Sequence, residues 1–214
     1  SISLLTYDSP LWYYSLGEPT WLLPKKSKDC KKVIVLAYAN EGIKEESKGH
    51  IQREESIGRL TRALPFYLGE KIQHEIELLL NVIIPTIKDV GPIVSRKVYE
   101  DDYIKDLLVK RNGDYMVTGG IREEEDSIYI ESYIYDKFDN KLKISKNLNK
   151  ISFGSEFNEM IKEIIDSLKV ELVYCGEYYK TPKDNLVSLY IQSLAQLLSQ
   201  SLVKNEYCKK DSLW

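Results

Sequence analysis

The chain has 214 residues, of which 43% are hydrophobic and 29% charged, and this composition indicates a globular protein rather than a disordered or fibrous one. Its 30 basic and 33 acidic residues leave a formal net charge of −3, so no overall field would attract nucleic acid or anionic lipid. The three cysteines are too scattered for a disulfide framework and indicate reduced thiols, and no cysteine or histidine pair has metal-ligand spacing. We therefore expect no metal and no cofactor.

The sequence also bears on the cellular compartment. It contains no run of about eighteen apolar residues, which predicts that there is no transmembrane segment. The first residues, SISLLTYDSP, lack the basic and then apolar layout of a secretion signal and indicate a cytoplasmic protein. A cell-envelope or periplasmic location is the alternative if a signal segment has been removed.

Residues 1–30 are rich in aromatic side chains but show neither helical nor strand periodicity, since prolines and glycines interrupt them. We predict an irregular N-terminal arm. Its rings, Trp12 and Trp21 among them, are expected to pack on the protein's own surface, with the groove of a partner as the alternative. The lysines of residues 25–32 indicate a solvated linker, and a phosphate-binding or membrane-surface role is the alternative there.

Strands and helices are predicted to alternate through residues 32–111. KVIVLAY, residues 32–38, is apolar nearly throughout and predicts a central strand. Leucine and isoleucine recur at helical spacing over residues 60–80, and Pro65 fits only if that helix begins near it. VIIPTI, residues 82–87, predicts a strand with an edge position at Pro85, and residues 93–99 predict a second extended piece. Residues 101–111 predict a short helix that ends at Asn112-Gly113.

The clearest local pattern is a β-hairpin from Asp114 to Asp136, made of two β-rich runs around the polar turn EEED. The second run alternates between two kinds of side chain. One set is Ile128, Ile130 and Ile134, and the other is Tyr129, Tyr133 and Tyr135. Because successive side chains of a strand point to opposite faces, we expect the isoleucine face to lie under a helix. KLKIS, residues 141–145, predicts a further antiparallel strand.

The last third of the chain predicts a helix, a strand and a helix. Ser155 is suited to cap a helix with an apolar stripe from Phe157 to Leu168, and VELVY, residues 170–174, predicts a strand. The last helix is predicted for residues 182–204, and its apolar face is formed by Leu186, Leu189, Tyr190, Leu194, Leu197 and Leu198. We expect this helix to fold back on the domain, with pairing to another chain as the alternative.

A family resemblance appears in KDLLVKRNGDYMVTGGIREEEDSIYIESYIYDKFDN, residues 105–140. The segment resembles the middle of the amino-terminal domain of TolB and its relatives, where a helix ending in glycine leads to an aspartate-tyrosine strand, a small-residue step, a charged turn and a returning strand. Those positions correspond to Gly113, Asp114-Tyr115, Gly119-Gly120 and Asp136. The resemblance extends roughly over residues 30–175, and outer-membrane lipoprotein activators of peptidoglycan synthases are also similar. It implies a TolB-like α/β fold and a role in protein interaction.

Residues that often carry chemistry lack the surroundings for it here. Gly119-Gly120 follows a strand, but no Gly-Lys-Ser/Thr motif and no helix follow, so these glycines predict a bulge or the close approach of a covering side chain instead of a phosphate loop. His50 and His74 have no ligand spacing, and Cys175 has no identifiable histidine partner. The acidic clusters at residues 45–46, 54–55, 101–102 and 123–126 lie in predicted turns or helix starts, where carboxylates are solvated or favoured by the helix dipole. We therefore predict that the protein is not an enzyme.

The resulting fold prediction is an α/β protein with a mixed β-sheet and a central hairpin, covered by amphipathic helices, similar to the TolB amino-terminal domain, with an added C-terminal helix. The chain divides into the aromatic arm (1–30), a TolB-like domain (31–175) and a C-terminal helical extension that packs on the domain (176–214).

The functional prediction is a non-enzymatic protein-interaction or scaffolding module of bacterial type. Its candidate interaction surface is formed by Trp12, Trp21, Tyr129, Tyr133 and Tyr135. Nucleic acid is disfavoured as a partner because Glu131 and the acidic turn would repel phosphates, and a homo-oligomer through the C-terminal helix stays open. The alternative is a small-molecule or nucleotide-binding protein or enzyme with a dispersed site.

Overall fold

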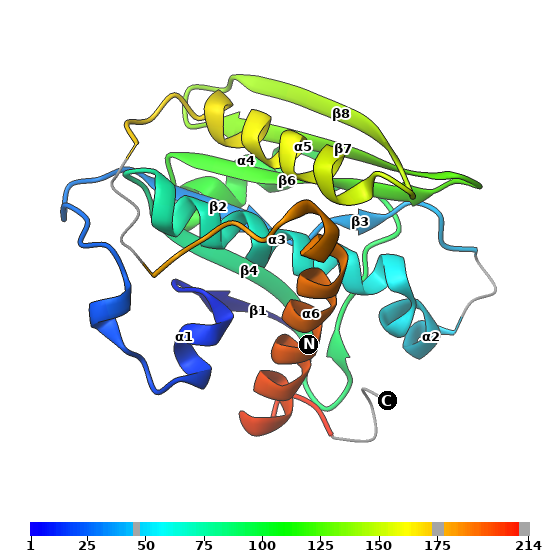
Figure 1. The fold of residues 1–214 in the computed structure, drawn as a ribbon. Coiled ribbons are helices and arrows are strands. Elements are labelled where there is room, and N and C mark those ends of the chain that lie inside the picture. Colours follow the sequence, from blue (N-terminus) through cyan, green and yellow to red (C-terminus); the bar gives the residue numbers. More distant parts are fainter. Residues whose placement is uncertain (45–47, 173–177, 210–214) are drawn as a thin grey trace.

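The computed structural model describes residues 1–44, 48–172 and 178–209, and these form a mixed β-sheet with helices on both faces (Figure 1). The sheet has eight strands, in the order β1-β4-β2-β6-β7-β8, with β3 beside β6 and β5 beside β4. The strands are β1 (Ile2–Tyr7), β2 (Lys32–Leu36), β3 (Ala39–Asn40), β4 (Leu79–Ile87), β5 (Gly91–Pro92), β6 (Tyr115–Glu123), β7 (Ser127–Asp136) and β8 (Lys141–Asn149). Parallel pairs at β2 adjoin antiparallel pairs at both sides, so the predicted mixed sheet is confirmed.

The helices divide between the two faces of the sheet. They are α1 (Leu11–Ser15), α2 (Gly49–Glu54), α3 (Ser56–Glu75), α4 (Asp101–Lys110), α5 (Phe153–Ser167) and α6 (Val187–Lys204), with short 3₁₀ turns η1 (Thr20–Leu22) and η2 (Asp184–Leu186). Residues of α3, α5 and α6 share one core with Val33, Val35 and Ile130, whereas residues of α4 share a smaller core with Ile34 and Met116. The strand β2 is buried on both faces, as its apolar sequence predicts.

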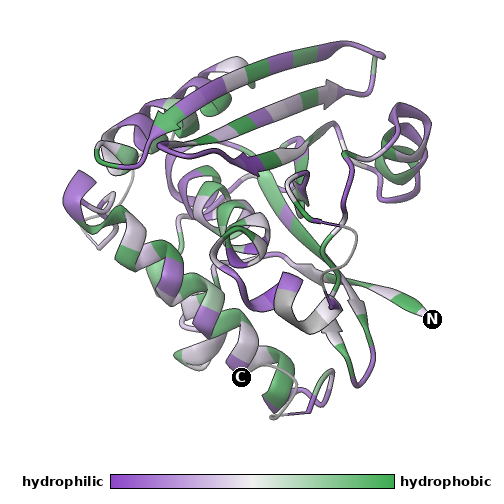
Figure 2. Cartoon of the chain, turned by 90° about the vertical axis from the view of Figure 1, so that its right-hand side faces the viewer, coloured by the Kyte–Doolittle hydropathy of each residue, from purple (hydrophilic) through white to green (hydrophobic). Residues whose placement is uncertain are grey.

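The predicted hairpin is present and its faces are as predicted. Strands β6 and β7 pair in register from Tyr115 opposite Asp136 to Glu123 opposite Ile128. Ile130 and Ile134 belong to the core under α5, and hydrophobic and hydrophilic residues alternate along the hairpin in Figure 2. Gly119 is required here because a Cβ atom on it would lie 1.9 Å from the carbonyl oxygen of Glu131 on the paired strand. The same Cβ atom would lie 2.7 Å from the ring of Tyr38, which is the predicted close approach of a covering side chain.

Helix α3 differs from the prediction, because Pro65 lies in its interior and not near its start. A proline has no amide hydrogen, so the carbonyl of the residue four positions earlier, Thr61, loses its helical donor. The backbone N–H of Tyr38, just after β2, donates to that carbonyl at 2.9 Å. The end of the central strand thus supplies the hydrogen bond that the proline removes, and the helix continues through it.

The prediction that residues 1–30 are irregular was wrong. Residues Ile2–Tyr7 form β1, which pairs antiparallel with β4, and Leu11–Ser15 form α1. The pairing partner lies far along the chain, so local periodicity carried no signal for it. This pairing also places β4 between β1 and β2, although Pro85 itself lies beyond the last residue that pairs with β2, Ile83.

Three further boundaries differ from the sequence predictions. Residues 93–99 contain no strand, since the extended piece is limited to Gly91–Pro92 of β5. Helix α5 begins at Phe153, so Ser155 lies inside it and does not cap it. Of the strand predicted for residues 170–174, Leu172 forms only an isolated bridge with Ile76, and residues 173–174 lie outside the described part of the chain.

Helix α6 packs along α3, and its buried side is formed by Val187, Ile191, Leu194, Ala195, Leu198 and Leu202. Leu186 and Leu189 were predicted on this side but are exposed, since the helix is rotated relative to the predicted stripe. By length and composition the segment Asp184–Lys204 is the single helix of the described residues that is apolar enough to cross a membrane. The absence of a transmembrane segment therefore stays a prediction.

Candidate functional site

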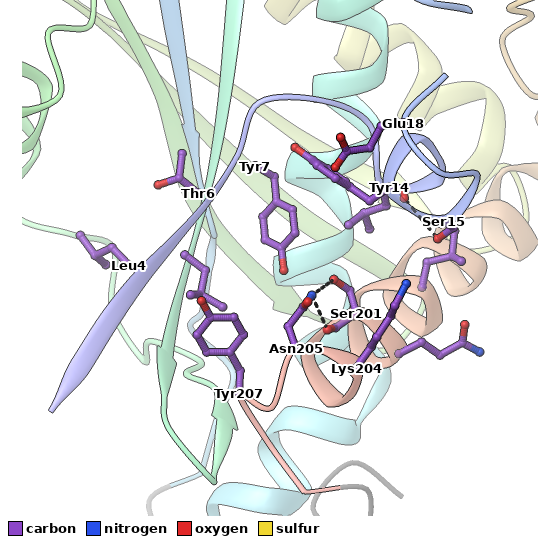
Figure 3. A pocket seen from close by; sticks show the side chains of 14 residues that line it. Leu4, Thr6, Tyr7, Tyr14, Ser15, Glu18, Ser201, Lys204, Asn205 and Tyr207 are labelled. Atoms are coloured by element: carbon purple, nitrogen blue, oxygen red, sulfur yellow. Dashed lines mark hydrogen bonds between the residues drawn. The ribbon is translucent and has the colours of Figure 1, made fainter. Parts of the chain in front are cut away.

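A groove lies beside β1, the edge strand of the sheet (Figure 3). It has a volume of about 830 Å³ and is bounded by β1, α1, the C-terminal half of α6 and Tyr207. Four consecutive residues of β1, Leu4 to Tyr7, line it. Because successive side chains of a strand point to opposite faces, a groove lined by all four runs along the edge of the strand itself.

The backbone of β1 presents unpaired groups to this edge. Leu4 lies opposite Pro85 and Thr6 opposite Ile83 in the antiparallel register. The carbonyls of Pro85 and Ile83 accept hydrogen bonds from the N–H groups of residues on the other side of β4, Ile93 and Ala37. The pairs with Leu4 and Thr6 are therefore the non-hydrogen-bonded ones of the ladder, and the N–H and C=O groups of both β1 residues point away from β4.

The same alternation turns the backbone groups of Ile2 outward as well. No backbone hydrogen bond to these groups is found within the described part of the chain. Exposed edge strands are usually protected by charge, proline or a bulge, yet β1 reads ISLLTY and carries none of these. Ile2 is 64% exposed, so the edge is both unpaired and apolar.

The wall of the groove opposite β1 is polar and fixed by hydrogen bonds. The Tyr14 hydroxyl donates to the carboxylate of Asp8 at 2.6 Å, and Asn205 Nδ2 donates to the carbonyl oxygen of Ser201 at 2.9 Å. In Figure 3 the Tyr7 ring points into the groove between these two groups. Glu18 and Lys204 are the charged residues that line it, so the groove carries no net charge.

The tyrosines of β7 lie elsewhere, toward the other edge of the sheet. Glu131 is central to their arrangement: the Tyr133 hydroxyl donates to it at 3.0 Å, and Lys143 Nζ lies 2.7 Å from it. Arg122 covers the Tyr129 ring, with its guanidinium carbon 4.7 Å from the ring centroid. The charge of Glu131 on this face is therefore already paired within the chain. Tyr135 is buried next to α4, where its hydroxyl donates to Asp101 at 2.8 Å.

Of the two tryptophans of the candidate surface, Trp12 lies on α1 and Trp21 on η1, whereas the three tyrosines lie on β7, so the structure does not bring all five predicted residues together. Trp12 stacks on the ring of His74, with centroids 6.0 Å apart and planes 18° apart. Trp21 is 71% exposed and meets the Tyr178 ring edge-on at 5.8 Å. Tyr129 and Tyr133 thus form one candidate surface, and Trp12 and Trp21 belong to another.

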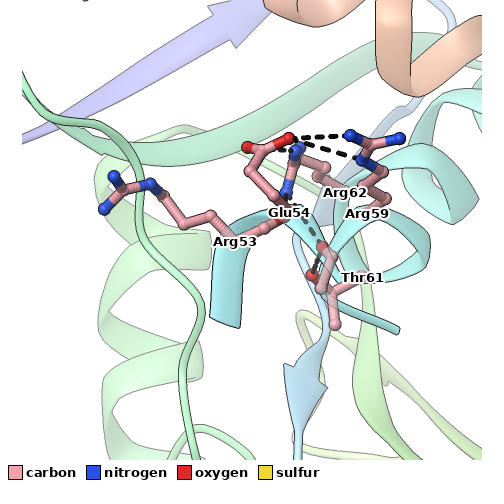
Figure 4. Close-up of polar contacts among 6 residues, drawn as sticks. Arg53, Glu54, Arg59, Thr61 and Arg62 are labelled. Carbon is pink, nitrogen blue, oxygen red and sulfur yellow. Dashed lines mark hydrogen bonds and ion pairs between the residues drawn. The ribbon is translucent and has the colours of Figure 1, made fainter. Parts of the chain in front are cut away.

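A cluster of arginines joins α2 to α3 (Figure 4). Glu54 forms ion pairs with Arg59 at 3.1 Å and with Arg62 at 3.3 Å. Arg62 is 2% exposed, and its guanidinium also donates to the backbone carbonyls of Arg53 and Gly58. Burial lowers the pKa of Arg62 to about 10, although the charge of Glu54 opposes this effect. Glu54, predicted to be a solvated acid, is thus the counter-ion of a buried cation.

The structure does not bring the other residues that were singled out in the sequence together into a site. No group of three or more metal-ligating side chains occurs within the described residues, and Cys30 and Cys208 are free thiols there. Cys175 and the acidic pair at residues 45–46 lie outside the described residues, and the side chain of His50 is not described either. In the lysine-rich stretch, Lys26 is drawn inward: its Nζ donates to the carbonyls of Ile72 and Leu78, and burial lowers its pKa to about 8.

No protein-family model and no curated protein sequence matches the chain. Among solved structures, TolB from Acinetobacter baumannii is similar with a TM-score of 0.41 and 11% identity over 78% of this chain. The chain spans only 31% of the length of that TolB. The PelC dodecamer from Paraburkholderia phytofirmans is similar with a TM-score of 0.38 and 8% identity, over 80% of this chain and 99% of PelC. The resemblance to TolB noted in the sequence thus reappears among solved structures as a weak similarity of fold.

Proposed function

We propose that the protein is a non-enzymatic interaction module that binds an extended segment of another protein along β1. The observation that carries this proposal is the outward direction of the backbone groups of Leu4 and Thr6 at an unguarded sheet edge. An added strand would satisfy these groups with main-chain hydrogen bonds, which is the recognition mode known as β-augmentation.

The groove supports the proposal because it can accommodate side chains of such a segment. An added strand projects alternate side chains to the two faces of the sheet. On one face they would meet the groove between Tyr7 and α6, and on the other they would meet the surface beside Leu4. Since the groove has one acidic and one basic residue, Glu18 and Lys204, it favours an uncharged, β-prone segment.

A proline substitution tests the mode of binding directly. Thr6→Pro removes an N–H group that points to the free edge, whereas Leu5→Pro removes one that points to β4. Thr6→Val is the matched control, because it keeps the N–H and removes only the hydroxyl that accepts a hydrogen bond from Arg111. We expect Thr6→Pro and Thr6→Val to melt close to the wild type, and Leu5→Pro to melt lower.

The functional readout is a quantitative comparison of proteins that co-purify with these variants. We expect a partner that is retained by the wild type and by Thr6→Val and is lost with Thr6→Pro. A partner retained equally by Thr6→Pro would show that β1 is not the binding strand. If the retained protein is a second copy of this chain, size-exclusion chromatography with light scattering will show a wild-type dimer that Thr6→Pro abolishes, and the partner class is then the chain itself.

The sheet face around Tyr129 and Tyr133 remains a second candidate contact surface for the same partner. Its charges are already paired within the chain through Glu131, so it supplies aromatic area and not electrostatic attraction. Tyr133→Ala should therefore weaken partner binding less than Thr6→Pro does, measured in the same co-purification.

A further inference from the structure

A second hollow lies behind α1 and differs in character from the groove at β1. It has a volume of about 310 Å³, and residues of α1, η1, α3, α6 and residues 178–180 line it. Five of its lining residues carry rings, namely Trp12, His74, Tyr178, Tyr179 and Tyr190. A volume near 300 Å³ is at the small end of the range for sites that take small molecules. We call this hollow the aromatic pocket.

Three of the five rings that line the aromatic pocket form a nearly parallel stack. His74 and Tyr179 stack with centroids 4.2 Å apart and planes only 6° apart, and Trp12 follows on His74 with planes 18° apart. The stacked rings cover each other's facing surfaces, so a planar ligand ring would stack in the same orientation on an outer face of the stack. The pocket therefore favours a small, flat and largely apolar body.

Hydrogen bonds to residues of α3 fix two of the segments that line the pocket. The Tyr190 hydroxyl donates to Glu70 Oε2 at 2.5 Å, and Glu70 is only 1% exposed. On the neighbouring residue of α3, Lys71 Nζ donates to the hydroxyl of Thr181 at 2.6 Å, which fixes the segment that carries Tyr179. Rings that are fixed before a ligand arrives lose little freedom when it binds.

The charge at the rim indicates the polar group of the ligand. Among the described residues that line the pocket, Lys180 is the one lysine, arginine, aspartate or glutamate, and it is exposed. Among the described residues it makes no ion pair, whereas Lys26 and Lys71 are both engaged with oxygen atoms of the chain. The indole N–H of Trp12, another residue that lines the pocket, has no acceptor in the described part of the chain. A free cation and a free donor beside stacked rings suit an anionic oxygen group.

We propose that the aromatic pocket binds a small aromatic carboxylate, with its ring on an outer face of the stack formed by Trp12, His74 and Tyr179 and its carboxylate paired with Lys180. An organic cation would also stack on aromatic rings, but Lys180 would repel it. This site is independent of the edge of β1, so the two proposals stand or fall separately.

Three ligands that share the indole ring system and differ in the charge of their side chain test the proposal. The probes are indole-3-acetate, its neutral analogue indole-3-ethanol and its cationic analogue tryptamine. The readout is the ¹H–¹⁵N indole cross-peak of Trp12 in ¹⁵N-labelled protein, assigned through its absence in Trp12→Phe. We expect indole-3-acetate to shift this peak saturably, indole-3-ethanol to bind about two- to fivefold more weakly, as the loss of one exposed ion pair predicts, and tryptamine to bind weakest.

Lys180→Gln is the decisive variant, since Lys180 is exposed and its replacement leaves the packed rings in place. It should abolish the preference for indole-3-acetate over indole-3-ethanol while both still shift the Trp12 peak. No movement of that peak with any probe at millimolar concentration would overturn the site, and equal or tighter binding of tryptamine would overturn the ligand class. Thr6→Pro should bind indole-3-acetate as the wild type does.

Discussion

The hydroxyl of Tyr190 on α6 donates a hydrogen bond of 2.5 Å to Glu70 Oε2 on α3, in the interface between the two helices. The other carboxylate oxygen, Oε1, is buried and has no hydrogen-bond partner in the described part of the chain. Burial therefore raises the pKa of Glu70 to about 7, although the Tyr190 hydrogen bond and the charge of Lys71 counteract part of the effect. A titratable group thus lies inside the contact that holds α6 to the rest of the protein.

The first prediction concerns the pH dependence of stability at Glu70. The folded state keeps this proton up to about pH 7, whereas an unfolded chain releases it near the ordinary glutamate pKa of 4.5. The stability contributed by the neutral form is therefore complete below pH 4.5 and is lost as the pH rises through 7, at a cost of about 3 kcal/mol. Glu70→Gln should be more stable than the wild type at pH 8, and the difference should vanish at pH 4.5. Urea unfolding across this range measures it, and Glu125→Gln in the exposed turn serves as control. A difference that does not change with pH would contradict the assignment.

The second prediction concerns the buried guanidinium of Arg62. Glu54→Gln leaves this cation in the core without a counter-ion, which should lower the free energy of unfolding by about 3 kcal/mol. Arg62→Met removes the cation and fills its volume, so the double variant Glu54→Gln/Arg62→Met should lose much less than the two single losses added together. A double-mutant cycle from urea unfolding measures the coupling. Strictly additive losses would show that the two groups do not stabilise each other.

The third prediction tests the register of the hairpin. Ile130 faces the core under α5, whereas Asn147, opposite Tyr129 on β8, lies on the other face and is exposed. Ile130→Asp places an unpaired charge in the core and should cost several kcal/mol, about 3 or more, in unfolding free energy. Asn147→Asp introduces the same side chain on the solvent side and should change stability by less than about 0.5 kcal/mol. Equal melting temperatures for the two variants would mean that the register is shifted.

The elements that the sequence predicted well are those whose burial pattern is local. Helix α4 and the β6–β7 hairpin lie where the periodicity places them, because each buries one face and that face recurs at the period of the element. Asn112, at the predicted end of α4, has a positive φ of 50°, as the Asn-Gly pair indicated. Prediction succeeded where the residues that decide the structure are neighbours in the chain.

The features that could not be predicted from the sequence depend on contacts between residues that are distant in the chain. The hydrogen bond from Tyr38 to Thr61 is what permits Pro65 inside α3, and no local rule supplies it. In the same way, β1 is a strand because β4 pairs with it, and the aromatic pocket exists because Tyr179 and Trp12 converge on His74. The one sequence signal for the candidate binding edge was the absence of any charge or proline in ISLLTY, which is unusual for an exposed strand.

The last prediction concerns α6. By its length and composition this helix could be either a core helix or a membrane-spanning one. Two leucines on the same helix separate them, because Leu198 is 0% exposed against α3 and Leu189 is 62% exposed. If α6 docks as the structure shows, Leu198→Ala leaves a cavity in the core and should lower the unfolding free energy by about 3 kcal/mol, whereas Leu189→Ala should change it by less than about 0.5 kcal/mol. Both substitutions remove the same atoms and leave helix propensity nearly equal, so the difference reports packing alone. Urea unfolding of the full chain measures both variants. A helix that spans a membrane or pairs with another chain through its exposed side would reverse the order or make the two losses equal, and either result would rule out the docked arrangement.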